Sequence, residues 1–165
     1  MDFLEIIKTR HSVRSYNNRT IESDKVIKLI NAGISAPSGK NGQPWKFRIV
    51  TNKDEIESLS QLSIYGNWMK KAGCFIIVFL DEERSYHYVK DVQSCGAAIQ
   101  NILLAAHAMQ IGGCWIGEII DKGEQVKSIL NIVSDSLILM GLITLGYTDE
   151  EPVLSERRSI DTYIV

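Results

Sequence analysis

The chain has 165 residues, of which 45% are hydrophobic and 23% charged, a composition typical of one globular domain. Its 18 Lys and Arg residues against 20 Asp and Glu residues give a formal net charge of −2. This balance offers no electrostatic basis for binding nucleic acid or an anionic membrane, so we expect neither as a partner.

The cysteines Cys74, Cys95 and Cys114 are widely spaced, with no Cys-x-x-Cys pair and no nearby row of histidines. We therefore predict neither a disulfide framework nor a metal site, and interpret all three as small core residues. The N-terminal residues lack the apolar core of a signal peptide, and no apolar run is long enough to span a membrane. We expect a cytoplasmic protein.

Residues 3–7 carry an apolar face on a short predicted helix, and basic and hydroxyl side chains follow at residues 10–16. In an extended segment, alternation sends Arg10, Ser12 and Arg14 to one side, with His11 beside them. Guanidinium groups and a serine hydroxyl together suit a phosphate or carboxylate. We expect an anion site here, and the alternative is a solvated basic edge strand.

Residues 36–45 form the most unusual stretch, rich in Pro, Gly, Ser, Asn and Gln. Residues 22–24 supply capping groups for an amphipathic helix predicted to end near Ser35, and residues 45–51 begin with the alternation of a half-buried strand. The stretch is therefore a loop on a rigid scaffold, where binding residues are common. The alternative is an elaborate turn between helix and strand. We expect Trp45 in the core.

The remaining predicted elements alternate between helix and strand. Residues 92–110 form a helix that is apolar nearly all round, which predicts burial within the fold or by a partner subunit. The other elements are a helix at 54–62, a break at 65–68, a strand at 74–80, a short extended piece at 112–117, a helix at 122–132, a strand at 137–147 and an alternating terminal strand at 160–165.

Common catalytic motifs are absent from the chain. There is no Gly-x-Ser-x-Gly elbow, no Rossmann glycine spacing and only a near miss for a phosphate loop at residues 33–40. The histidines are scattered, and His107 on an apolar helix is interpreted as a core residue. Four clusters remain, and together they could hold a flat, phosphorylated cofactor. They are the basic segment at residues 10–14, the loop at 36–45, the glycine-flanked piece at 112–117 and the arginine pair at 157–158.

The order and spacing of three segments resemble the FMN-dependent nitroreductase family, as a compact, short-chain member. They are residues 10–16 (RHSVRSY), residues 36–47 (APSGKNGQPWKF) and the Ala-rich helix that leads into residues 112–117 (GGCWIG). The resemblance implies an α+β, nitroreductase-like three-layer sandwich with a mostly antiparallel sheet. It implies one domain over residues 1–165, an intertwined homodimer with FMN at the subunit interface, and a tail at about 149–165 docked on the partner subunit.

The resemblance also implies roles for individual residues. Arg10, Ser12 and Arg14 would hold the phosphate and ribityl end of FMN, with His11 beside them and Arg157 or Arg158 closing on the phosphate. Ser38, Asn41 and Gln43 would face the flavin ring, in a loop shaped by Pro37 and Gly39. Cys114, Trp115, Ile116 and Gly117 would lie along the ring's other side through backbone groups. Tyr65 and Asn67 fall where relatives line the substrate pocket.

The function implied is that of an NAD(P)H oxidoreductase. NADH or NADPH would reduce the flavin at N5, and a small acceptor such as a nitroaromatic, quinone or enone would then take the electrons in a ping-pong cycle. No side chain of the chain need act as a catalytic residue. The alternative is an FMN-binding module without turnover, acting as a carrier, a sensor or an interaction partner.

Overall fold

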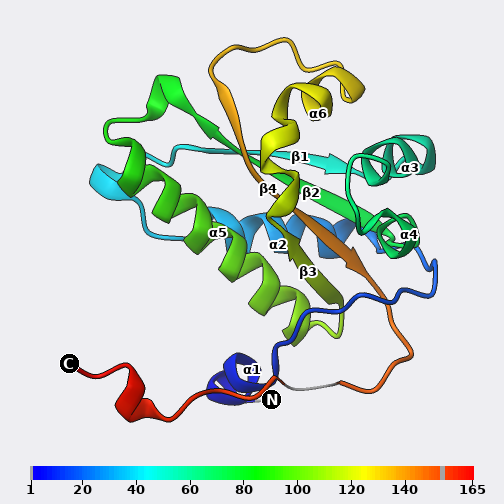
Figure 1. Ribbon diagram of the computed structural model, residues 1–165, viewed down its shortest axis with the longest axis vertical. Helices are drawn as coiled ribbons and strands as arrows, with labels where there is room; N and C mark the ends of the chain where they lie inside the picture. The colour runs from blue at the N-terminus through cyan, green and yellow to red at the C-terminus, as the bar shows by residue number, and fades with distance from the viewer. Residues whose placement is uncertain (1, 153–154) are drawn as a thin grey trace.

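The computed structural model describes residues 2–152 and 155–165, and its centre is a four-stranded antiparallel sheet (Figure 1). The strands lie in the order β1-β2-β4-β3, so β2 and β4 are central and β1 and β3 are edges. Their bounds are β1 (Trp45–Val50), β2 (Cys74–Asp81), β3 (Gly112–Ile116) and β4 (Leu137–Gly146). The predicted α+β class with an antiparallel central sheet is confirmed.

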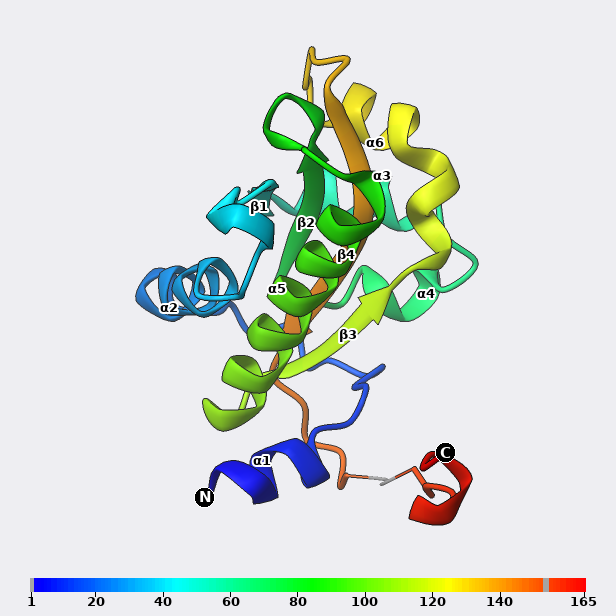
Figure 2. The same cartoon turned by 90° about the vertical axis from the view of Figure 1, so that its left-hand side faces the viewer.

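Helices cover both faces of the sheet and make a three-layer arrangement (Figure 2). Every residue of β2 is buried, because a continuously apolar strand needs cover on both faces. One core lies between the sheet and α2 and α5, and the second lies between the sheet and α3, α4 and α6. The helices are α1 (Phe3–Thr9), α2 (Ser23–Ile34), α3 (Lys53–Ser60), α4 (Gly66–Met69), α5 (Tyr88–Ala108) and α6 (Gly123–Ile129).

Helix α5 is the long element that organises one face of the molecule. Its 21 residues give it a length of about 31 Å. It starts earlier than the predicted residue 92, because the Asp91 carboxylate accepts hydrogen bonds from the backbone N–H groups of Tyr86 and His87 and fixes the first turn. Ala98, Ile99 and Ile102 are buried in the core, whereas the neighbouring residues Gly96, Ala97 and Leu104 stay partly exposed.

Some predicted elements have different bounds in the structure. The predicted break at residues 65–68 is wrong, since α4 begins at Gly66. The helix predicted for 122–132 is shorter, because residues up to Lys122 form the 3-10 turn η3 (Glu118–Lys122) and Asn131 adopts a positive φ of 52°. Helix α2 has no side-chain cap hydrogen bond from its N-cap residue Glu22. The core positions of Trp45 and the cysteines are confirmed.

The C-terminal residues do not form the predicted strand. Ile160–Thr162 is a 3-10 turn, η4, and the residues around it are exposed (Figure 1). An alternating sequence forms a strand only when it pairs with a neighbouring strand, and the described residues 155–165 pair with none. Within the described ranges, no helix combines the length and the apolar character needed to cross a membrane.

Candidate functional site

The segment after α1 is fastened to the open edge of β3. Ser12 forms an isolated parallel bridge with Gly113, and the Val13 N–H donates to the Gly113 carbonyl at 3.1 Å. Val13 is buried, and Gly112 leaves room for it, since a side chain at Gly112 would collide with Val13. Ser12 and Arg14 therefore share the outer side of an extended segment, as the alternation predicts. The rest of the segment forms no strand.

Tyr16 fixes the inner side of this segment. Its hydroxyl donates to the Val13 carbonyl at 2.9 Å and lies 2.7 Å from the Thr144 Oγ1, in the core. Either hydroxyl can donate across the contact between Tyr16 and Thr144, and the Thr144 hydroxyl also lies 3.4 Å from the Cys114 carbonyl oxygen, which can accept its proton. Burial raises the pKa of Tyr16 far above its usual value. The tyrosine stays neutral and holds the backbone between Ser12 and Arg14.

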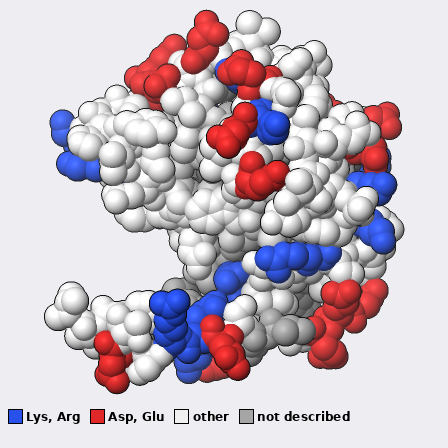
Figure 3. Space-filling model, in the orientation of Figure 1, with Lys and Arg blue, Asp and Glu red and all other residues white. Residues whose placement is uncertain are grey.

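A hollow of about 320 Å³ opens beside this segment. His11, Ser12 and Arg14 line it together with Glu150 and Glu151, and Val13, Thr148 and Ser155 also contribute to the wall. Figure 3 shows basic side chains gathered on this lower part of the molecule, with acidic ones beside them. Sequence reasoning predicts the first three residues, but no pattern pointed to the acidic pair. Arg157 and Arg158 are exposed in the tail and do not line the hollow.

His11 is tied to the end of α5 through Thr9. The His11 Nδ1 lies 2.9 Å from the Thr9 carbonyl oxygen, and the Thr9 hydroxyl lies 2.8 Å from the His107 Nε2. Burial, with His11 and Arg10 nearby, lowers the pKa of His107. His107 is thus a partly buried, hydrogen-bonded residue, which is close to the predicted core role. It anchors the basic segment to the C-terminal end of α5.

A ligand beside β3 could contact the backbone of the strand, whereas most of its side chains are buried. Cys114 and Ile116 are buried in the same core cluster as Val13, and burial raises the pKa of the Cys114 thiol. In the described residues, the outer edge of β3 has no strand partner beyond the bridge at Gly113. Gly117 follows in open space, where an added side chain would meet no atom within 4 Å. This edge can donate and accept backbone hydrogen bonds.

Trp115 points to the opposite face of β3 and remains 42% exposed. Its indole lies against Gly96 of α5 and across Gly141 of β4, where a side chain would collide with the indole nitrogen. Gly141 has a φ of 153° and sits at a register shift between β2 and β4. The irregularity and the missing side chain together make room for the ring.

The loop before β1 has a strained backbone. Lys40, Asn41 and Gln43 have φ values of 54°, 54° and 49°, in the left-handed region that costs non-glycine residues about 1 kcal/mol or more. The Ser38 hydroxyl oxygen accepts the Gln43 N–H at 3.0 Å, which closes the loop. Strain that the surroundings maintain is common at binding sites. The sequence predicts a loop here, and the strain could not be read from it.

Pro37, Ser38 and Gly39 line a shallow hollow against the first half of α5. The other wall consists of residues of α5 that the sequence did not predict as site residues. The helix is apolar nearly all round, so its pattern did not indicate which side faces a ligand. These residues are Lys90, Gln93, Ser94 and Ala97. Gln43 lines a different hollow, beside Trp45 and Phe47. The structure therefore brings Ser38 together with α5, and directs Gln43 elsewhere.

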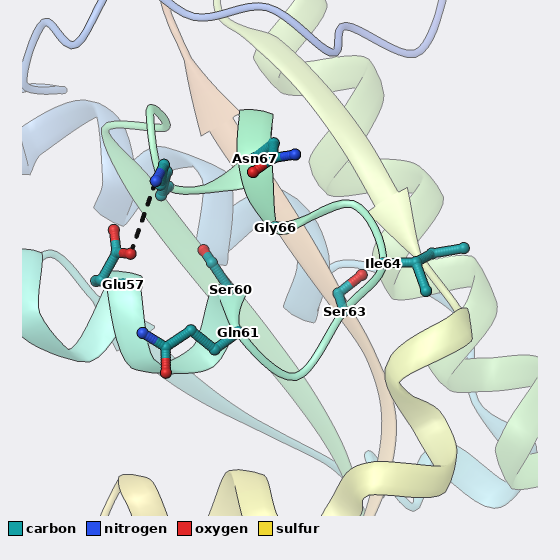
Figure 4. A pocket seen from close by; sticks show the side chains of 8 residues that line it. Glu57, Ser60, Gln61, Ser63, Ile64, Gly66 and Asn67 are labelled. Atoms are coloured by element: carbon teal, nitrogen blue, oxygen red, sulfur yellow. Dashed lines mark ion pairs between the residues drawn. The ribbon is translucent and has the colours of Figure 1, made fainter.

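Tyr65 and Asn67 lie at the start of α4. Asn67 belongs to a pocket of about 250 Å³ between α3 and α4, with Glu57 and Gln61 on the other wall. Figure 4 shows Asn67 on the α4 side of this pocket, across from Glu57 and Gln61 of α3. Tyr65 is exposed and packs near Trp68, with ring centroids 6.0 Å apart.

The two polar clusters lie at opposite ends of α5 within one chain (Figure 1). The basic segment meets the helix near His107, and the Pro37–Gly39 loop meets it between Lys90 and Ala97. The helix is about 31 Å long, so the two clusters line separate hollows. One chain does not assemble them around one small molecule.

Comparison with known proteins gives a consistent match over most of the chain. The model of the Nitroreductase family matches residues 7–65 and 62–147. A protein of Methanothermobacter thermautotrophicus, provisionally named an NADH dehydrogenase/NAD(P)H nitroreductase, is 36% identical over 154 residues, covering 92% of this chain and 80% of its own length. The NADPH-flavin oxidoreductase of Vibrio harveyi is 27% identical over 166 residues, covering 93% of this chain and 69% of its own.

A solved structure agrees with the fold described above. It is a nitroreductase-like protein from Desulfovibrio desulfuricans in complex with FMN, 35% identical to this chain. The superposition has a TM-score of 0.94 and covers 100% of this chain and 96% of the other. The compact size predicted from the sequence is therefore shared by this similar protein.

Replacing Tyr16 by phenylalanine tests the clamp on the basic segment. Tyr16→Phe keeps the ring but leaves the Val13 carbonyl without its donor, so the free energy of unfolding should fall by about 1–3 kcal/mol. Denaturant titration measures this. The control is Tyr147→Phe, which removes contacts to Glu22 and Lys25 at the surface and should cost less than about 1 kcal/mol. Equal losses in both variants would contradict the assigned role of Tyr16.

Proposed function

The chain belongs to the nitroreductase family, and on that premise we propose that it is an FMN-dependent oxidoreductase. It passes electrons from NADH or NADPH to a small acceptor such as a nitroaromatic, a quinone or an enone. When bound, FMN would supply the redox chemistry, which is hydride acceptance from the nicotinamide donor and electron donation to the acceptor in alternating half-reactions. The role of the protein is to bind FMN, to orient the donor and the acceptor beside it, and to shield the reaction from water.

The basic segment is the observation that carries this proposal. Ser12 and Arg14 share one side of a backbone held by Gly113 and Tyr16, and His11 lines the same hollow. A guanidinium and a hydroxyl held in place suit a phosphate monoester, because charge-assisted hydrogen bonds need little reordering. We assign the phosphate end of FMN to Arg10, His11, Ser12 and Arg14. Glu150 and Glu151 oppose an anion, so this assignment requires the tail to turn them away.

The open edge of β3 suits the flavin ring. Backbone groups from Cys114 to Gly117 lie along an unpaired edge, and Gly117 leaves space for a flat ligand to approach. Backbone N–H groups there would stabilise negative charge at the polar edge of the ring during electron transfer. The assignment uses the backbone of these residues, which agrees with the burial of Cys114 and Ile116.

A second copy of the chain would complete the site. Pro37, Ser38, Gly39 and Asn41 lie at the far end of α5, so they would approach the ring from a partner related by two-fold symmetry. The exposed apolar surface supports a homodimer, since α1 buries none of its residues and Phe3 is 63% exposed. We assign the tail, with Arg157 or Arg158, to contacts at this interface. Tyr65, Asn67 and Gln43 are assigned to its margin.

Purified protein should carry the bound-flavin absorption spectrum, and anaerobic NADH or NADPH should bleach it. An added acceptor should then restore the oxidised spectrum without loss of flavin, measured in a stopped-flow spectrophotometer. Colourless protein that FMN fails to reconstitute would contradict the proposal. Yellow protein that neither nicotinamide reduces would favour a flavin-binding module without turnover.

Arg14→Ala should weaken FMN binding by roughly 1.5–3 kcal/mol, which is the range for a charge-assisted phosphate contact. Fluorescence titration of apoprotein with FMN measures the change in Kd. The matched control is Arg48→Ala, which removes an exposed guanidinium on β1 that pairs with Glu55 of α3, and it should leave Kd unchanged. An unchanged Kd for Arg14→Ala would place that side chain outside the phosphate site.

A further inference from the structure

A cluster of two lysines and a tyrosine lies beside the hollow that Ser38 lines. The Lys40 Nζ lies 4.7 Å and the Lys90 Nζ 5.5 Å from the centre of the Tyr86 ring. Lys90 also lines the hollow with Pro37, Ser38 and Gly39. Attraction between an ammonium group and a ring face holds each side chain near one position. Two positive charges, one from the loop and one from α5, are thus concentrated at one rim.

Tyr86 is fixed in place from two directions. Asp91 is buried, and its Oδ2 accepts hydrogen bonds from the Ser85 hydroxyl at 2.8 Å and from the N–H groups of Tyr86 and His87 at 3.0 Å each. Burial favours the neutral acid, but these donors outweigh it and the pKa of Asp91 lies below its usual range. On the other side, Gly39 packs on the Tyr86 ring, where any side chain would collide with the phenol.

In the described parts of the chain, neither Lys40 nor Lys90 forms an ion pair with a carboxylate. Lys40 keeps its position at the cost of a left-handed backbone, with a φ of 54°. The two ammonium groups lie 4.7 and 5.5 Å from one ring centre, and the long side chains could both turn toward a phosphate group bound beside Tyr86.

The position of this cluster indicates which ligand it binds. It adjoins the loop assigned to the flavin ring, where the nicotinamide donor must arrive, and within one chain it lines a different hollow from the basic segment assigned to the FMN phosphate. The rest of the dinucleotide then extends across the surrounding surface. NADPH carries one phosphate group more than NADH, on the adenosine ribose, in addition to the diphosphate that both donors share.

We propose that Lys40 and Lys90, positioned by Tyr86, bind the 2′-phosphate of NADPH and make NADPH the preferred electron donor. The proposal rests on the function proposed above. Lysine ammonium groups act on phosphate as point charges, so both should contribute without fixed geometry. Tyr86 acts through the lysines and is a positioning residue.

Two nucleotide fragments separate phosphate recognition from every other contact of the donor. FMN-loaded protein is titrated with 2′,5′-ADP and with 5′-AMP, and binding is followed by calorimetry. We expect 2′,5′-ADP to bind at least about tenfold more tightly, and Lys40→Gln and Lys90→Gln each to reduce that ratio by about threefold to tenfold. Lys28→Gln is the control, since Lys28 is exposed on α2 and paired with Asp24.

Tyr86 is tested by the same ratio. Tyr86→Phe keeps the ring face and should retain the ratio, whereas Tyr86→Leu should lower it by about threefold. Anaerobic flavin reduction should show the matching change in the preference for NADPH over NADH. Equal binding of both fragments to the wild type, or an unchanged ratio in both lysine variants, would overturn the proposal.

The result also separates this inference from the proposed function. Wild-type protein that binds FMN and is reduced equally well by NADH and NADPH contradicts the role of the lysine pair alone. Protein that takes up no FMN contradicts the proposed function itself. Lysine variants that slow reduction by both donors to the same extent would mean that the ammonium groups act on the flavin ring, and that outcome also overturns the inference.

Discussion

The docking of residues 12–16 on the open edge of β3 is the interaction on which the candidate site depends. An edge strand leaves backbone groups unpaired, and the chain uses one end of this edge for its own N-terminal segment. The Tyr16 hydroxyl and Thr144 secure that segment from inside, so Ser12 and Arg14 can face outward without losing their position. The remaining edge, from Cys114 to Gly117, stays available to a flat ligand.

Helix α5 imposes the second constraint. The basic segment meets it near His107 and the Pro37–Gly39 loop meets it between Lys90 and Ala97, so one chain keeps the two clusters in separate hollows. A two-fold axis across α5 would set the start of one helix beside the end of the other. The partly exposed small residues Gly96 and Ala97 would allow such an approach.

Local pattern was enough to predict the strands, the long helix and the outward side of the basic segment, whereas the antiparallel sheet was expected from the family resemblance. Alternation over a few residues determines which side chains share a face, as Ser12 and Arg14 show. The clamp between Tyr16 and Thr144 could not be predicted, because it joins residues 128 positions apart. The positive φ values at Lys40 and Gln43 were also hidden, since neither residue type favours them. The prediction of a strand at residues 160–165 was wrong, because alternation alone does not provide a neighbouring strand to pair with.

The central claim is that each flavin site combines the basic segment of one chain with the loop of the other. Differently tagged Arg14→Ala and Gly39→Val chains can be co-expressed, and the mixed dimer isolated through both tags. Gly39→Val disturbs the loop because its side chain would meet Tyr86. If the sites are shared, one site carries both substitutions and the other carries none, so the mixed dimer should bind one FMN per two chains. A mixed dimer that binds FMN as poorly as both parent variants would contradict the account.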